Sequence, residues 1–264
     1  MIKTGGLLLM ILLNAFLINK AVIQHGVIKI PSYMVGLIFI VLSLPLIHLN
    51  LHWGVTISTS ILILTYHEII NLSDSINIKK TVFKTGFFVG TLIMIDYHFI
   101  WLYLIIIISL PYYAQFNWRN CLIQLIGLIY PFGFYYSLSA SNYHIPTTPF
   151  DLDLSFNQLD YYFYDYYPFL FGILILLMLS MIELYRNYYR KKENAKKAFN
   201  FLFIFIIVII LKTLFLDNLK FIHLLIVPGT ILIANYLIYS KHKKFRTFLL
   251  GLLFILFTLK FFQL

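Results

Sequence analysis

Apolar runs recur along almost the whole chain, and they constrain the fold more than any other feature. Of the 264 residues, 61% are hydrophobic and only 11% are charged. An ordinary soluble domain carries about 25% charged residues, so this chain has too few charges to cover a surface that faces water. A helix that crosses the hydrocarbon core of a bilayer needs roughly 20 mostly apolar residues. The sequence therefore predicts an integral membrane protein made of α-helices.

Charged and turn residues divide the chain into apolar runs that each predict one crossing. The expected fold is all-α, a polytopic transmembrane helix bundle of about 10 spans that forms a single integral membrane domain over residues 1–264. The first run resembles a signal peptide, but no small-residue cleavage site follows it, so we expect a retained helix. The runs are 5–18, 33–50, 53–71, 83–95, 98–114, 120–140, 166–185, 199–215, 221–239 and 247–262.

Lysine and arginine collect in alternate loops, which predicts the orientation because short loops rich in them stay cytoplasmic. Sixteen basic residues fall on one side and four on the other. The bias places both termini outside the cytoplasm and favours a full crossing at 83–95, although a run this short is also compatible with a half-helix. An external loop is predicted at about 141–165 and a basic cytoplasmic loop at about 186–198. The four external basic residues are Lys3, Lys212, Lys220 and Lys260.

The charge and the motifs exclude several function classes. The net charge is +10, but the basic residues lie in short loops between apolar runs, so their partner is the anionic lipid surface and not nucleic acid. The single cysteine, Cys121, permits no intrachain disulfide and no cysteine-based metal site. Nucleotide-binding glycine loops, nucleophile elbows and zinc-protease motifs are absent from the sequence, which argues against an ATP-driven role.

Acids and histidines gather at the helix ends that are predicted to be external. His48 and His52 are spaced i, i+4, which would put both imidazoles on one helix face as half of a metal site. Asp96 and His98 could complete that ligand set or supply a general base. A divalent metal is thus a candidate cofactor. The alternative is that these histidines only form hydrogen bonds at the membrane interface.

Further polar residues are candidates for substrate binding or packing. Asp151 and Asp153 in the external loop, together with Arg119, are the candidate substrate-binding residues. Glu68 lies near the cytoplasmic end of its run and could pair with a nearby basic residue. Gly86 and Gly90 form a GxxxG motif, which predicts close packing of two helices.

Three segments in the first 140 residues form a distinctive order. They are INKAVIQHGVIKIPSY, INIKKTVFKTGFFVGTLIMIDYHFIWLYLI and FNWRNCLIQLIGLIYPF, and the most distinctive residues are Trp118, Arg119 and Asn120. In these segments the chain resembles an uncharacterised family of polytopic inner-membrane proteins from the Bacteroidetes group of bacteria. The family has no established activity, so the resemblance implies a multi-pass protein of the bacterial inner membrane and supplies no catalytic residues.

The leading functional hypothesis is a cell-envelope glycosyltransferase, or an accessory of one, that uses a polyprenyl-phosphate-linked sugar at the external face. Asp96 and His98 would be its catalytic residues, with a metal at His48 and His52. One alternative is a non-catalytic scaffold that binds other membrane proteins through the basic loop. The other is a transporter of small solutes or lipids, which Glu68 and the proline-containing helices favour.

Overall fold

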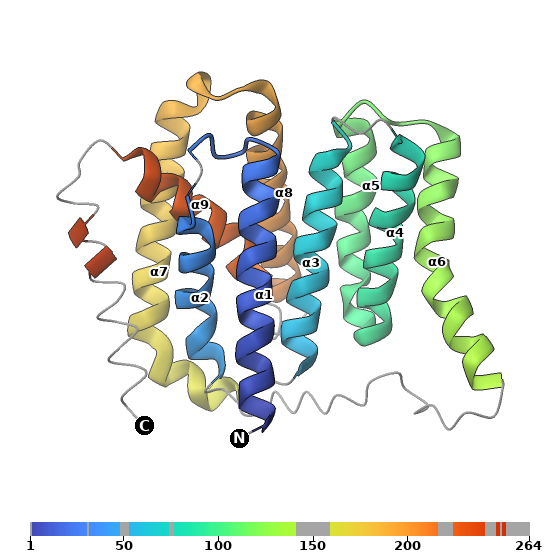
Figure 1. Ribbon diagram of the computed structural model, residues 1–264, viewed down its shortest axis with the longest axis horizontal. Coiled ribbons are helices and arrows are strands. Elements are labelled where there is room, and N and C mark those ends of the chain that lie inside the picture. Colours follow the sequence, from blue (N-terminus) through green and yellow to red (C-terminus); the bar gives the residue numbers. More distant parts are fainter. Residues whose placement is uncertain are drawn as a thin grey trace. The chain divides into compact units, whose positions relative to one another are not determined.

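The structure is a computed structural model that describes residues 2–30, 32–47, 53–73, 77–140, 159–215, 224–240, 247–248 and 250–251. Every regular element in these ranges is helical, which confirms the predicted all-α class (Figure 1). Nine of the ten predicted runs coincide with a helix, and the run at 247–262 lies almost entirely outside the described residues. The α-helices are α1 (Ile2–Gln24), α2 (Met34–Ile47), α3 (Trp53–Asn71), α4 (Ile78–Ile95), α5 (Leu102–Tyr112), α6 (Trp118–Ala140), α7 (Leu159–Asn187), α8 (Glu193–Phe215) and α9 (Ile226–Tyr239).

Only some of these helices are long and apolar enough to cross a membrane. Within the described ranges there are three, so the prediction of about 10 spans is not supported. α2, α5 and α9 are too short, with 14, 11 and 14 residues. α4 carries too many charges, because it begins at Ile78 and so includes Lys79, Lys80 and Lys84. The three candidate spans are Gly5–Gln24, Phe171–Arg190 and Glu193–Lys212.

Helices extend into both predicted long loops. α7 begins at Leu159, so the last seven residues of the loop expected at 141–165 are helical, and 141–158 lies outside the described residues. The loop expected at 186–198 is also mostly helical, because α7 continues to Asn187, the 3-10 helix η3 follows at Tyr188–Arg190, and α8 begins at Glu193.

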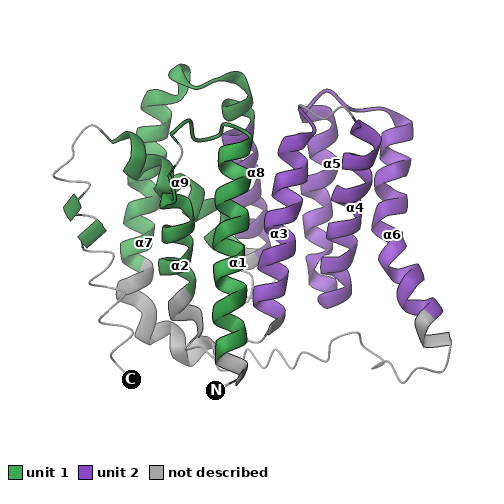
Figure 2. Cartoon of the chain, in the orientation of Figure 1, with its two compact units in different colours: residues 1–51, 155–197, 218–264 green, residues 52–154, 198–217 purple. Residues whose placement is uncertain are grey.

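The chain divides into two compact units (Figure 2). Unit 1 comprises residues 1–51, 155–197 and 218–264, and contains α1, α2, α7 and α9. Unit 2 comprises residues 52–154 and 198–217, and contains α3 to α6. α8 starts in unit 1 and continues in unit 2.

In unit 2, α4 packs against α6 so closely that no side chain would fit at the glycines of the contact. A Cβ at Gly86 would collide with the backbone of Gln124, and a Cβ at Gly90 would collide with the backbone of Leu128. Gly127 of α6 faces the backbone of α4 in the same way. The GxxxG prediction is therefore confirmed, and the rising order of the paired residues shows that α4 and α6 run parallel.

Polar contacts join the helices of unit 2 inside this packing. The side chain of Gln124 is 1% exposed. Its Nε2 donates to the Ile106 carbonyl of α5 at 3.1 Å and to Thr85 Oγ1 of α4 at 3.4 Å. Where water is absent, interhelical hydrogen bonds of this kind hold helices together.

The outer face of α6 is apolar, which is the reverse of a helix in a water-soluble protein. Its exposed residues Leu122, Leu125, Ile126 and Ile129 follow helical spacing, whereas the polar Gln124 is buried. A helix at a water-facing surface places its polar side outward. An exposed apolar stripe of this kind is typical of a lipid-facing or partner-facing surface. It is consistent with location in a membrane.

In unit 1, a C-terminal cap turns the chain from α1 toward α2. Gly26 adopts the left-handed conformation, with φ of 61°. Its N–H donates to the Ile23 carbonyl at 3.0 Å, and the N–H of Val27 donates to the Val22 carbonyl at 3.1 Å. Together these two bonds form the Schellman cap that usually requires glycine at this position. The cap fixes the course of the short α1–α2 loop, which carries Lys29.

Candidate functional site

The best-defined polar site in unit 2 begins at Asp96, directly after α4. Asp96 leaves the helix in an extended conformation, and its Oδ1 accepts a hydrogen bond from the backbone N–H of His98 at 2.9 Å. A carboxylate at this position caps the 3-10 helix η1 (Tyr97–Trp101) that leads into α5. The local sequence therefore holds the Asp96 carboxylate and the His98 ring close together.

The same carboxylate oxygen also binds the imidazole. Nδ1 of His98 lies 2.7 Å from Asp96 Oδ1, and the two side chains are only 25% and 14% exposed. Since an ionised carboxylate can only accept, Nδ1 carries the proton and Nε2 is the basic nitrogen of the neutral ring. The structure thus brings together the two predicted catalytic residues as a carboxylate–imidazole pair, which is the arrangement that orients a histidine general base.

A third group reaches the site from a distant part of the sequence. Lys212 of α8 is 5% exposed, and its Nζ donates a hydrogen bond to the backbone carbonyl of His98. Nζ also lies 5.7 Å from the ring centroid of Phe99. An ammonium group therefore stands beside the Asp96–His98 pair. We refer to Asp96, His98 and Lys212 as the Asp–His–Lys cluster.

One feature of the sequence could have identified Lys212 as a candidate site residue. It is the only charged residue in the apolar run 199–215, and a charge inside such a run marks a candidate site. The sequence prediction counted it among the few external lysines but did not join it to Asp96 and His98. Its partner His98 is 114 residues away in the chain, so only the fold reveals the contact.

The structure separates Arg119 from the Asp–His–Lys cluster. Arg119 is exposed at the start of α6, where its guanidinium lies 5.7 Å from the ring centroid of Trp118. Because α4 and α6 are parallel, Arg119 lies near the start of α4 and Asp96 at its end. The helical rise of 1.5 Å per residue places them roughly 20 Å apart along the helix axes. Arg119 therefore cannot contact the same small group as the cluster.

The remaining predicted site residues cannot be placed. His48, His52, Asp151 and Asp153 lie outside the described residues. In the described part of the chain, no three His, Cys, Asp or Glu side chains are grouped so that they could hold a metal ion. The predicted metal site at His48 and His52 accordingly stays a prediction.

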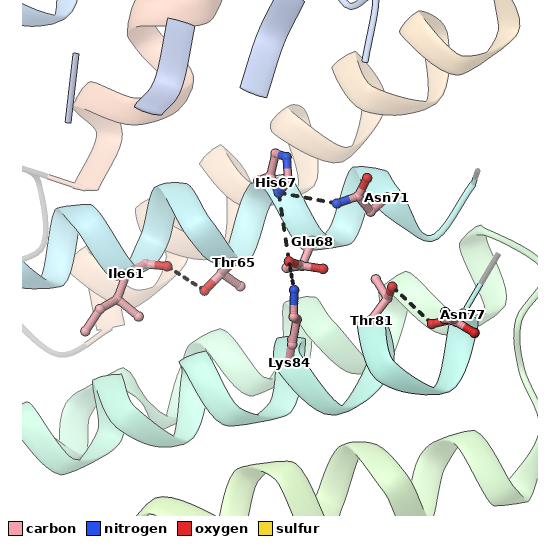
Figure 3. Close-up of polar contacts among 8 residues, drawn as sticks. All are labelled: Ile61, Thr65, His67, Glu68, Asn71, Asn77, Thr81 and Lys84. Atoms are coloured by element: carbon pink, nitrogen blue, oxygen red, sulfur yellow. Dashed lines mark hydrogen bonds and ion pairs between the residues drawn. The ribbon is translucent and has the colours of Figure 1, made fainter. Parts of the chain in front are cut away.

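A second charged cluster connects α3 and α4, near the opposite end of α4 from Asp96 (Figure 3). Lys84 Nζ donates to Glu68 Oε1 at 2.8 Å, and the Glu68 side chain is only 10% exposed. His67 Nδ1 lies 4.0 Å from the same oxygen and 3.3 Å from Asn71 Nδ2. The predicted pairing of Glu68 with a nearby basic residue is confirmed. The geometry is that of an interhelical ion pair.

Fold and site together define the class of this protein as a helical protein with membrane-spanning candidates and a half-buried carboxylate–imidazole–ammonium cluster. No protein-family model, curated protein or solved structure matches the chain. The resemblance to the inner-membrane family from Bacteroidetes stays a prediction. The function must therefore be argued from the site itself.

Proposed function

We propose that this chain is a multi-pass inner-membrane enzyme that transfers a sugar from a polyprenyl-phosphate carrier at the external face. The observation that carries this proposal is the Asp–His–Lys cluster, in which a base and a cation converge at one helix end. In the reaction, His98 Nε2 removes the proton from an acceptor hydroxyl as its oxygen bonds to the anomeric carbon. The bond between that carbon and the phosphate oxygen breaks, and the released phosphate carries the negative charge.

Each member of the cluster has a separate role in this proposal. Asp96 fixes the tautomer of His98 and stabilises the imidazolium that forms when the ring takes up a proton. Lys212 provides positive charge close to the leaving phosphate, where charge develops during the reaction. The site requires no metal for these steps, and a metal at His48 and His52 would be an addition to them.

The contacts within each unit support the predicted sidedness of the loops. In unit 1, the predicted cytoplasmic residues Lys29 and Lys191 both contact Tyr239. In unit 2, the predicted external residues His98 and Lys212 are in contact. These two pairings connect only residues that the basic-loop pattern assigns to the same side, and the external position of the termini rests on that pattern alone. The transport and scaffold alternatives stay predictions.

Asp96→Asn tests the proposed base without removing the helix cap. Asparagine also accepts the hydrogen bond from the His98 N–H, so we expect the thermal unfolding midpoint to be nearly unchanged. The amide no longer stabilises an imidazolium, and sugar transfer in proteoliposomes should fall by about a hundredfold or more. Glu193→Gln, at an exposed pair with Lys196, is the matched control and should retain full activity. Full activity of Asp96→Asn would exclude Asp96 from the reaction.

A further inference from the structure

Two lysine-bearing segments from separate parts of unit 1 meet at one end of α9. Lys191 lies between η3 and α8, and its Nζ donates to Asn235 Oδ1 of α9. Nζ also lies 4.1 Å from the ring centroid of Tyr239, the last residue of α9. The hydroxyl of Tyr239 accepts a hydrogen bond from the backbone N–H of Lys29 at 2.9 Å. Tyr239 therefore holds both lysine-bearing segments.

The two positive charges affect each other. Burial lowers the pKa of Lys191 to about 8, and the positive charge of Lys29 acts in the same direction. The carbonyl groups at the C-terminus of α9 favour a cation and so account for one ammonium. Lys29 is exposed, so an anion can approach both ammonium groups from the solvent side and offset the repulsion between them.

The position along the chain indicates which anion is available. One candidate membrane span, Gly5–Gln24, ends five residues before Lys29, and another, Phe171–Arg190, ends directly before Lys191. Residues at the ends of membrane-spanning helices lie at the depth of the lipid headgroups. The same loop also contains Ser32, whose hydroxyl is buried and has no hydrogen-bond partner. The loop thus has hydrogen-bonding capacity that the described chain does not use.

We propose that Lys29 and Lys191, arranged around Tyr239, bind the phosphate of an anionic lipid headgroup. The two ammonium groups supply the charge and the donors, and the phenol ring of Tyr239 fixes Lys191 through a cation–π contact. This site lies in unit 1 and does not involve the Asp–His–Lys cluster of unit 2.

The test is a lipid titration of the purified full chain in an uncharged detergent, followed by its thermal unfolding midpoint. Phosphatidylglycerol should raise the midpoint, and phosphatidylcholine should have little effect. Each lysine donates a charge-assisted hydrogen bond to the phosphate in this proposal, so Lys29→Gln or Lys191→Gln should weaken the apparent affinity about tenfold. Lys192→Gln, an exposed neighbour, is the control and should leave the affinity unchanged.

The variants are chosen so that a folding defect cannot imitate the result. The contact of Lys29 with Tyr239 uses the backbone N–H, which Lys29→Gln retains, so this variant decides the test if Lys191→Gln does not fold.

Inorganic phosphate is the second probe. Competition by phosphate would show that the site recognises the phosphate group itself, and no response to phosphate would show that it requires the whole lipid. Equal binding of both lipids, or an equal loss in Lys192→Gln, would overturn the proposal.

The pH dependence gives an independent readout. Lys29 and Tyr239 face Lys191, and Arg190 and Lys192 flank it in the chain. Above a pKa of about 8, Lys191 loses its proton and its charge, whereas a bound phosphate raises that pKa and favours the charged form. Lipid affinity of the wild type should therefore fall as the pH rises through this range. Lys191→Arg keeps its charge, so its affinity should change much less, and an equally steep fall would contradict the site.

Discussion

Gly90→Ala in α4 should destabilise the protein strongly, whereas Gly133→Ala in the adjacent helix α6 should stabilise it slightly. A Cβ at Gly90 meets the backbone of Leu128, which cannot move aside as a flexible side chain can. Overpacking of this kind costs about 1–3 kcal/mol, and we expect the upper end because α4 and α6 would have to separate. The free energy of unfolding, measured by titration with a denaturing detergent, tests the expected loss.

Gly133 is the matched control, because it lies in α6 and nothing occupies the space around its missing Cβ. Alanine favours a helix over glycine by about 0.5–1 kcal/mol, so the control should show a gain. Opposite signs at the two positions would confirm that the α4–α6 backbone contact is real. A neutral Gly90→Ala would show that these helices do not approach as closely as the structure indicates.

Lys84→Met should have the second largest effect, because it leaves the buried Glu68 carboxylate without its cation. Breaking a buried ion pair on one side costs about 3–5 kcal/mol. The Lys84 side chain is 40% exposed, so the pair is partly screened, and we expect about 2–3 kcal/mol. The same detergent titration measures this loss in the free energy of unfolding.

The reverse substitution gives a sharper comparison. Glu68→Gln removes the negative charge of a side chain that is only 10% exposed. It leaves Lys84, whose side chain can extend toward water. It should therefore cost less than Lys84→Met, and the double variant should be more stable than Lys84→Met alone. Strictly additive effects would mean that the two side chains do not interact across α3 and α4.

The sequence predicted the helices well because apolar runs and charged breaks are local signals. The run 53–71 matches α3 residue for residue, and GxxxG identified the α4–α6 contact. The predicted number of spans is not supported, and α4 shows one physical reason. A helix such as α4 begins within a basic segment, so its charges lie inside the helix and not in a loop. The aromatic and acidic segment 159–165 was predicted to be part of a loop, although α7 already begins at Leu159.

The candidate site could be predicted only in part. Asp96 and His98 are two residues apart, and the cap of η1 forces them together, so sequence alone was sufficient for this pair. Lys212 required the tertiary fold, because no local pattern relates it to His98. The role of Arg119 stays a prediction, because its predicted partners Asp151 and Asp153 lie outside the described residues. Its distance from Asp96 required the register of α4 against α6.

The central claim is that the Asp–His–Lys cluster binds a polyprenyl-phosphate-linked sugar. Native mass spectrometry of the full chain in mild detergent, after incubation with such a lipid, tests it most directly. The account predicts that the wild type retains the lipid and that Lys212→Met, which lacks the ammonium beside His98, retains much less. A wild type that carries no such lipid, or a Lys212→Met variant that retains it equally, would contradict the account.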